Sequence, residues 1–500
     1  MKLVIISFCW IAIIVSGIFL RFDQLSKRPF HADEATGARI TATRMESADY
    51  QFDPSHYHGP ILSGLAMQIS KSQHENHWQE LSKGSLRFLP ALAGCMVLLV
   101  PLLWIKRLGV LPMLLATALL ATSPLLVYYS RMFIHEMLLV SFGMFALLCI
   151  IRFPRYGLPG IFIGLMFASK ETFAFSIIAW TAAACGIAWE NRKAMNSQWL
   201  QLNWKTYRNP IFLSLLTAAI VSILFYTNGF RQPQGALDAV KTFFVYKTGE
   251  GHAKPFDWYF QLLALPQRSG GIWWFGTPVV LLAVCAFGLS FRKDSPAPFV
   301  IRFIAYAALG HFAIYSFISY KTPWLACLPW AHVCLLAGFA VTGIASRHLT
   351  TKLGLSLLVG ITLITQFQQA RLASGRLASD GRNPFAYVPT RNEMENLEPW
   401  LLKLQQAAPE IPLEPVAVIG KDYWPLPWYL RSFDQVGYWP SAPSNLAERA
   451  LVFAMPEVID TVSPQLETSH TLLPRGLRAG VPFYLFVKND LWKIWMEDGN

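Results

Sequence analysis

Two adjacent carboxylates, Asp33 and Glu34, follow the first apolar segment, where a membrane helix is expected to give way to a polar loop. An unpaired acid near lipid costs on the order of 3 kcal/mol at the bilayer centre, so acids at such a boundary indicate a functional site. A carboxylate that reaches a hydroxyl can take its proton as a new bond forms. We predict that Asp33 is such a general base. Glu34 would orient the acceptor or hold cations in place, or it is a first-turn acid favoured by a helix dipole.

Three other short polar loops each place a lone cation near an acid or an aromatic side chain. A single Lys or Arg at the end of a span commonly extends to the lipid headgroups. Three such cations on one side of the membrane would also suit a common anionic group, and phosphate is the expected one. Under that interpretation the acids hold the cations in place or orient an acceptor. The residues are Arg131 with Glu136, Lys170 with Glu171, and Lys321.

The segment between residues 21 and 87 contains five of the eleven histidines of the chain, among them His31 and His58. Histidine beside Asp and Glu can bind a divalent metal. Interfacial loops also use histidine as a solvated or helix-capping group. Because the spacings match no standard metal site, we assign no metal ligand and expect no cofactor, with a divalent metal as the alternative.

The composition is that of a polytopic membrane protein, since 54% of the residues are hydrophobic and only 14% are charged. A membrane span needs roughly 17–25 apolar residues, and the chain offers about eleven such runs, two of them short. The first run exceeds the usual ~7–15 residue core of a signal peptide, so we expect a retained helix. The runs lie near residues 3–20, 88–104, 110–128, 137–151, 157–168, 172–189, 210–227, 272–290, 299–318, 325–344 and 353–367.

Basic residues gather in alternate loops, which the positive-inside rule assigns to the cytoplasm. Asp33 and the three lone cations then face outward from the cell (inner) membrane. Basic charge spread over five inner loops explains the net charge of +12 and argues against nucleic-acid binding. All seven cysteines fall inside predicted spans, so no disulfide framework is indicated. The basic loops lie near residues 106–107, 152–155, 192–208, 292–302 and 347–352.

After residue 367 the sequence becomes polar and contains many prolines, which predicts a second domain. We expect a membrane domain over residues 1–367 and a soluble extracytoplasmic domain over 368–500. A helical pattern precedes several short apolar runs, which is typical of a small α/β domain. The external loop 228–271, with Gly249, Gly251 and Pro255, is a candidate lid. The helical pattern covers residues 393–406, and the apolar runs cover 416–419, 424–430, 451–454 and 483–487.

Several short elements, taken together, resemble the membrane glycosyltransferases of the GT-C superfamily. The nearest resemblance is to the protein-mannosyltransferase-like branch, the flippase-activity-associated proteins. The likeness runs through all the predicted spans. Besides the acidic pair, the elements are Tyr57-His58-Gly59-Pro60, Arg87-Phe88-Leu89-Pro90, Tyr128-Tyr129-Ser130-Arg131, Ser169-Lys170-Glu171, His252-Ala253-Lys254-Pro255, Tyr320-Lys321-Thr322-Pro323-Trp324 and Tyr423-Trp424-Pro425-Leu426-Pro427-Trp428.

The resemblance implies a GT-C fold, an external active site, a sugar donor carried on polyprenyl phosphate, and inversion at the anomeric carbon. The acceptor would be a hydroxyl of a glycan, lipid or protein of the cell envelope. The family's catalytic acid maps onto Asp33, a second acid onto Glu136, and the lysine after the fifth span onto Lys170. The chain departs from many relatives at Gly59-Pro60 or at His58, where they have Lys-Pro.

The expected catalytic set is therefore Asp33, Glu34 and Glu136. Outward-facing chemistry fits a lipid-linked donor, and the chain has no Asp-x-Asp pair of the kind that holds a nucleotide sugar and metal. Two other classes stay open: a lipid-linked sugar flippase or transporter, and a non-catalytic partner in surface-glycan export whose tail docks other proteins. Aromatics such as Tyr57, Trp273, Trp274 and Trp324 suit either sugar stacking or an interfacial belt. The expected substrate- and phosphate-binding residues are His31, Tyr57, His58, Arg131, Lys170, Glu171, His252, Lys254 and Lys321.

Overall fold

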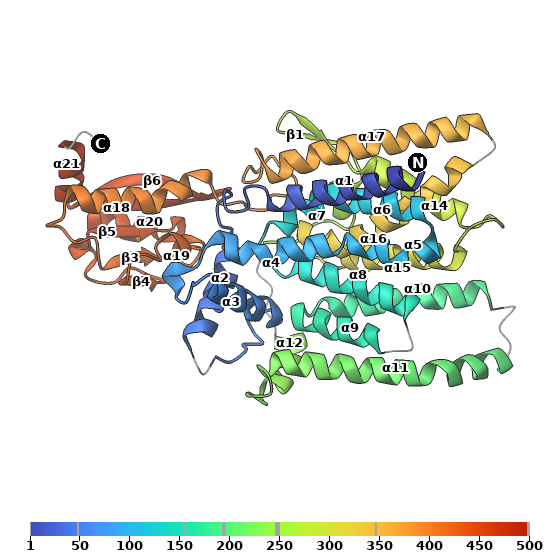
Figure 1. Ribbon diagram of the computed structural model, residues 1–500. Helices are drawn as coiled ribbons and strands as arrows, with labels where there is room; N and C mark the ends of the chain where they lie inside the picture. The colour runs from blue at the N-terminus through green and yellow to red at the C-terminus, as the bar shows by residue number, and fades with distance from the viewer. Residues whose placement is uncertain are drawn as a thin grey trace.

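A computed structural model describes residues 2–47, 50–153, 157–192, 197–245, 251–345 and 348–497. A long bundle of helices forms one part of the molecule, and a small domain containing a sheet forms the other (Figure 1). The predicted mainly helical class, with a small α/β unit after the bundle, is confirmed. Parts of the predicted basic loops and lid lie outside the described residues, among them Arg155, Lys193, Gly249 and Arg347.

Seven helical segments among the described residues are long and apolar enough to cross a membrane, and eight if a bent pair counts as one span. The bent pair is α6 (Val110–Thr122) and α7 (Pro124–Ser130), which meet at 57° where Ser123 caps α7. Two shorter apolar helices are α9 (Leu158–Ser169) and α14 (Thr277–Leu289). The count of eleven spans therefore stays a prediction.

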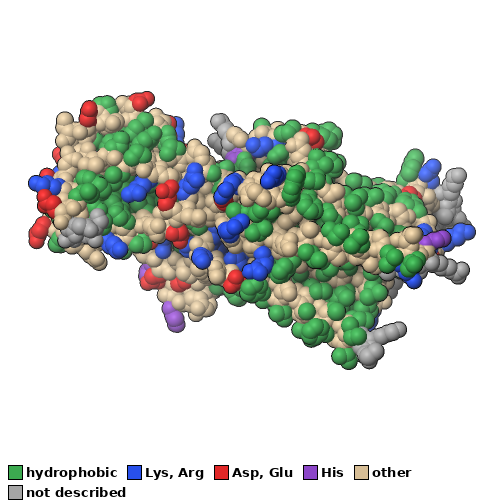
Figure 2. Space-filling model, turned by 90° about the horizontal axis from the view of Figure 1, so that it is seen from above, with side chains coloured by type: hydrophobic (Ala, Val, Ile, Leu, Met, Phe, Trp, Pro, Cys, Tyr) green, Lys and Arg blue, Asp and Glu red, His purple; other side chains and the backbone are tan. Residues whose placement is uncertain are grey.

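The remaining helices of the bundle follow the predicted apolar runs, and Figure 2 shows hydrophobic side chains over much of this part of the surface. The first run forms a helix that begins at the end of the bundle far from the sheet and ends beside the sheet domain (Figure 1). The bounds are α1 Lys2–Phe22, α4 Lys83–Met96, α5 Leu99–Leu108, α8 Glu136–Arg152, α10 Phe173–Glu190, α11 Ser197–Tyr226, α15 Pro298–Phe317, η3 Pro323–Ala326, α16 Cys327–Gly338, η4 Phe339–Ala345 and α17 Leu349–Ser374.

Both long segments predicted as external loops contain helices. The first holds α2 (Ala32–Glu46), α3 (Ile61–Ser72) and the turn η1 (Trp78–Glu80). The predicted lid holds α12 (Gly235–Val245), α13 (Trp258–Leu263) and β1 (Gln267–Ser269), which forms a hairpin with β2 (Ile272–Trp274) just after the lid. These elements cover the end of the bundle that faces the sheet domain (Figure 1).

Helix α2 begins with a capping box that places both carboxylates in its first turn. The His31 ring accepts a hydrogen bond from the Asp33 N–H at 3.1 Å, and the Glu34 carboxylate accepts one from the His31 N–H at 3.0 Å. Such reciprocal bonds satisfy amide groups that a helix start leaves unpaired. The start of α2 is therefore fixed by its own sequence.

The Glu34 side chain is fully buried and forms two 2.7 Å bonds with Arg87 of α4. It also accepts bonds from Arg28, at 3.3 Å, and from the Phe133 N–H, at 2.8 Å. Burial alone would raise the pKa of Glu34, but the two guanidinium groups lower it to about 2. Arg87 in turn donates to the carbonyls of Leu25, Arg28 and Pro29, so one buried ion pair joins four segments.

The C-terminal sheet has the strand order β4-β3-β5-β7-β6, in which β4, β3 and β5 are parallel and β7 is antiparallel to both its neighbours. The apolar runs at 416–419, 451–454 and 483–487 lie on strands, whereas the run at 424–430 contains a short helix. The bounds are η5 Asn392–Asn396, α18 Leu397–Ala407, β3 Val416–Ile419, α19 Leu426–Tyr429, β4 Val436–Trp439, η6 Leu446–Glu448, β5 Leu451–Ala454, η7 Pro456–Val458, α20 Ile459–Leu466, β6 His470–Arg478, β7 Val481–Lys488 and α21 Asn489–Glu497.

The sheet domain packs on the segment that leads into α2. The Phe30 ring lies 4.1 Å from the Trp428 ring, centroid to centroid, and the Phe30 N–H donates to the Tyr429 hydroxyl at 2.9 Å. The Thr390 hydroxyl donates to the Phe30 carbonyl at 2.8 Å. Helix α17 runs through the predicted domain boundary at 367/368 and ends at Ser374. The two parts of the chain are thus held together directly beside Asp33.

Glu34→Gln should destabilise the protein strongly, because it leaves the buried Arg87 guanidinium without its counter-charge. Removing one partner of a buried ion pair typically costs about 3–5 kcal/mol. We expect a clear fall in the apparent Tm of the purified full-length protein in detergent. The matched control is Asp33→Asn, one residue away on the same helix turn, which should leave the Tm unchanged. Equal Tm values for wild type and Glu34→Gln would contradict the structural role.

Candidate active site

A cavity of about 620 Å³ lies at the end of the bundle that carries α2. Its walls come from α2, the Tyr57-His58 segment, the turn before α8, the turn between α9 and α10, and the loop after α15. Helix α12 of the predicted lid contributes Thr242 and Phe243. Of the predicted site residues, the cavity brings together Asp33, Tyr57, His58, Glu136, Lys170, Glu171 and His252.

The two adjacent carboxylates point to different places. Successive residues of an α-helix are about 100° apart, so Asp33 and Glu34 cannot share a direction. The Asp33 side chain is 51% exposed and lines the cavity, and the nearest ion-pair partner among the described residues is the His31 ring, 3.8 Å away. Glu34 is buried against Arg87 and does not line the cavity. Of the interpretations of Glu34, the geometry fits an acid in the first turn of α2 that holds a cation in place.

Two ion pairs lie in the cavity wall, Lys170 with Glu136 and His58 with Glu171. The Lys170 ammonium lies 2.5 Å from Glu136 at the start of α8, and the His58 ring lies 3.0 Å from Glu171. Burial alone would raise the pKa of Glu171, but His58 and Lys170 lower it to about 2. Burial, His58 and Lys170 together lower the pKa of His135 well below its usual value, which keeps that ring neutral. The Lys170 ammonium is held in this wall by its ion pair with Glu136.

Gly59, where the chain differs from the family that it resembles, is packed tightly against the end of α9. A Cβ at this position would lie 2.1 Å from the carbonyl oxygen of Ala168, at the end of α9. The Gly59 carbonyl also lies 3.2 Å from the His135 ring. Close backbone contact thus sets His58 beside Glu171, and no larger residue fits here.

Two of the three predicted cations do not line the cavity, so it does not bring all three together. The Arg131 guanidinium donates to the carbonyls of Leu20 and Arg21 at the end of α1. The buried Lys321 ammonium donates to the carbonyls of Ile318, at the end of α15, and Lys254. Helix ends leave carbonyls unpaired and carry negative partial charge, which attracts nearby cations. Lys170 alone of the three lines the cavity.

His31 and Lys254 also lie outside the cavity lining, and both form hydrogen bonds at its rim. The His31 ring caps α2, and its Nε2 lies 3.0 Å from the Tyr387 carbonyl. The Lys254 N–H donates to the Ser319 carbonyl at 3.0 Å, which fixes the neighbouring His252. Trp324 lines the cavity, whereas Trp273 and Trp274 belong to the β1–β2 hairpin and do not.

Tyr387 is a site-forming residue that sequence reasoning missed. Its hydroxyl lies 2.6 Å from the Nδ1 of His252, and its ring packs against Trp324 with centroids 5.6 Å apart. Tyr320 lines the same cavity, and burial raises its pKa to about 12, so it stays a hydrogen-bond donor. The Tyr-Lys-Thr-Pro-Trp element pointed to Tyr320, but no local signal marks Tyr387, which joins from 135 residues away.

Among the described residues there is no group of three or more His, Cys, Asp or Glu side chains arranged to hold a metal ion. The histidines of residues 21–87 are spread over caps and cavity walls instead. His31 caps α2, His56 pairs with Asp53, and His58 pairs with Glu171. Each of these rings is already engaged by a protein group.

No protein-family model matches the chain, and no curated protein is similar to it in sequence. Solved structures are similar in fold. ArnT from Cupriavidus metallidurans in the apo state matches with a TM-score of 0.64 and 13% identity, over 97% of this chain and 99% of that one. The same protein bound to undecaprenyl phosphate gives a TM-score of 0.63 and 13% identity, over 96% and 98%.

The archaeal oligosaccharyltransferase AglB from Archaeoglobus fulgidus, in complex with an inhibitory peptide and a dolichol-phosphate, also matches. Its TM-score is 0.57 at 13% identity, over 95% of this chain and 73% of that one. The chain has the GT-C fold. The similarity in fold to ArnT extends over nearly the whole chain. The mannosyltransferase-like branch stays a prediction.

Gly59→Ala should lower stability, because the new methyl group meets the Ala168 carbonyl at a distance no atom tolerates. Overpacking of this kind typically costs about 1–3 kcal/mol. We expect a lower Tm in a thermal unfolding scan of the purified protein. The matched control is Gly360→Ala within α17, where a Cβ meets nothing within 4 Å. A Tm for Gly59→Ala as high as that of Gly360→Ala would show that the loop is not packed as described.

Proposed function

We propose that the protein transfers a sugar from a polyprenyl-phosphate donor to an acceptor hydroxyl on the external face of the membrane. One observation carries the proposal: an exposed carboxylate, Asp33, and a fixed ammonium, Lys170, line the same cavity. The fold supports it, because ArnT and AglB share that fold and were solved with undecaprenyl phosphate and a dolichol-phosphate. The reaction needs one group to take a proton and another to receive a leaving phosphate.

The cavity suits a donor with both an apolar and an anionic part. Apolar side chains from α3, α10 and α12 form part of the wall, among them Leu62, Phe175 and Phe243. The cavity lies at the end of helices that are long enough to span a membrane. A polyprenyl chain can then stay in the lipid while its phosphate reaches Lys170.

The proposed reaction is a single inverting displacement. Asp33 takes the proton of the acceptor hydroxyl as its oxygen bonds to the anomeric carbon from the face opposite the phosphate. The bond between the anomeric carbon and the phosphate oxygen breaks, and the electron pair leaves with polyprenyl phosphate. The Lys170 ammonium stabilises the charge that develops on that oxygen, so no acid catalyst is needed.

Other groups of the cavity wall hold the proposed phosphate-binding groups in place and contact the sugar. Glu136 holds the Lys170 ammonium, and Glu171 holds the His58 ring. Tyr57, His252 and Tyr320 present ring and hydroxyl groups to the cavity and are the proposed sugar contacts. Trp324 lines the wall and can stack on a sugar face.

Chemistry is favoured over transport by where the ionisable groups lie. The cavity gathers them from the start of α2, the start of α8 and the turn between α9 and α10, all at one end of the bundle. A transport path would require such groups along the spans. The role as a non-catalytic partner with a docking tail stays an untested alternative.

Asp33→Asn should abolish most transfer, because an amide cannot take the acceptor proton. General-base catalysis contributes about 10²–10⁴-fold, and we expect a rate loss in that range. The measurement is release of undecaprenyl phosphate from synthetic undecaprenyl-phosphate hexoses, followed by mass spectrometry, with purified protein and a membrane extract as the acceptor source. Asp257→Asn, an exposed acid outside the cavity lining, is the control. Undiminished release by Asp33→Asn would refute the assignment of the base.

Lys170→Met should slow transfer by about 10²–10³, the usual loss when one group that stabilises developing charge is removed. Because it also leaves Glu136 buried without its partner, a double variant with Glu136→Gln separates the two effects. The double variant should regain stability while remaining slow. Lys254→Met should keep its rate, since Lys254 does not line the cavity. A fast double variant would remove Lys170 from the phosphate role.

A further inference from the structure

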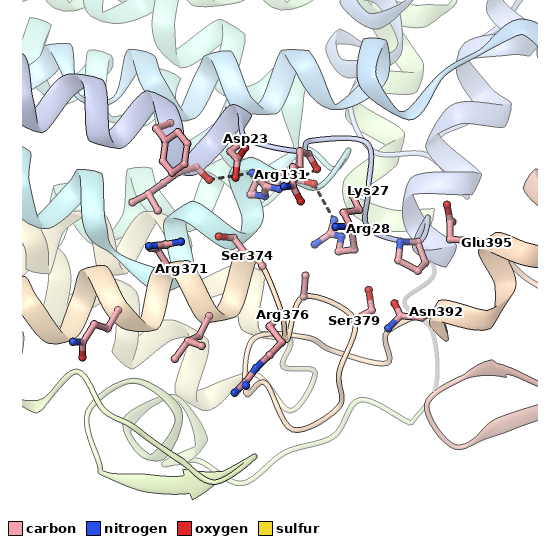
Figure 3. Close-up of a pocket in the computed structure, with 18 residues that line it drawn as sticks. Asp23, Lys27, Arg28, Arg131, Arg371, Ser374, Arg376, Ser379, Asn392 and Glu395 are labelled. Carbon is pink, nitrogen blue, oxygen red and sulfur yellow. Dashed lines mark hydrogen bonds between the residues drawn. The ribbon is translucent and has the colours of Figure 1, made fainter.

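A second cavity, of about 850 Å³, lies between the ends of α1 and α17 and shares no lining residue with the candidate active site. Its walls come from the last turn of α1 and the segment after it, from Arg131, from the last turn of α17 and the segment after it, and from η5. Figure 3 shows its basic side chains around one hollow. Lys and Arg side chains also gather on the α1 and α17 side of the molecule, between the helical bundle and the sheet domain (Figure 2).

The lining carries a clear excess of positive charge, with five cations against Asp23 and Glu395. Glu395 is already paired with Lys83, and Arg28 with Glu34. The exposed cations of the lining are Lys27, Arg371 and Arg376. Within the part of the chain that the structure describes, no carboxylate lies in ion-pair distance of them. Like charges that line one cavity repel one another, and a bound anion would relieve that repulsion. The five cations are Lys27, Arg28, Arg131, Arg371 and Arg376.

Polar and apolar groups complete the lining. Ser379 and Asn392 face the hollow with a hydroxyl and an amide (Figure 3). Phe19, Leu20 and Leu372 form an apolar wall. From that wall, exposed apolar side chains continue down both candidate spans, with Val15 and Phe19 on α1 and Ile364 on α17 at least half exposed. The cavity therefore lies where a lipid-covered surface ends.

We propose that this cavity binds a phosphate group, presented by the headgroup of an anionic lipid or free in solution. Guanidinium groups donate paired hydrogen bonds that match phosphate oxygens, and Arg371 and Arg376 offer two of them. The apolar wall and the exposed faces of α1 and α17 give acyl chains a place beside the same cavity. The site is separate from the proposed catalytic centre, and the inference does not rest on the proposed transfer reaction.

The test is a titration of purified full-length protein in detergent with phosphatidylglycerol, followed by native mass spectrometry. A parallel arm measures uptake of radiolabelled inorganic phosphate by equilibrium dialysis. The variant is Arg371→Gln with Arg376→Gln, and both positions are exposed, so folding is expected to hold. The matched control is Lys352→Gln, which removes one exposed charge near the opposite end of the same helix.

We expect the double variant to lose at least about tenfold in affinity for its ligand, which corresponds to about 1.4 kcal/mol. Lys352→Gln should bind as wild type does. If the loss is seen with phosphatidylglycerol and not with inorganic phosphate, the phosphate is that of a lipid headgroup. If it is seen with inorganic phosphate at equal strength, the ligand is free phosphate. If the double variant binds both probes as tightly as wild type, or if wild type binds neither, the proposal is overturned.

Discussion

The buried pair of Glu34 and Arg87 is the interaction on which the arrangement of the site depends. Taking both charges out of water is costly, so the pair persists only because every oxygen of Glu34 has a donor. Those donors come from α4 and from the turn before α8, and Arg87 adds the segment that joins α1 to α2. The pair fixes how α2 is rotated, and that rotation turns Asp33 toward the cavity.

Ion pairs also occur in the cavity wall, where they keep charged groups in place before any substrate binds. Glu136 fixes the Lys170 ammonium and Glu171 fixes the His58 ring. Preorganised charge is effective because no reorganisation is needed as the transition state forms. Asp33 differs from these acids, since it faces the cavity with half of its side chain exposed. The contrast separates the proposed base from the groups that hold the site.

The sheet domain is part of the site as well as a neighbour of the bundle. Phe30, just before α2, packs against Trp428, and Tyr387 joins His31 to His252 across the cavity rim. An isolated antiparallel β-bridge between Ala253 and Tyr320 lies at the opposite rim. Segments from the start, middle and end of the chain therefore meet around one space.

The sequence by itself determined the class of the protein, because long apolar runs must become helices in lipid and short apolar runs between turns become buried strands. It also marked Asp33, Lys170 and the Tyr-Lys-Thr-Pro-Trp element. The tertiary structure decided which of two adjacent acids reaches the cavity, since the partner of Glu34 lies 53 residues away. It likewise directed Arg131 and Lys321 to the carbonyls of helix ends and brought Tyr387 to the rim. Hydropathy and spacing report which residues a segment contains, whereas the direction of a side chain is set by what packs against it.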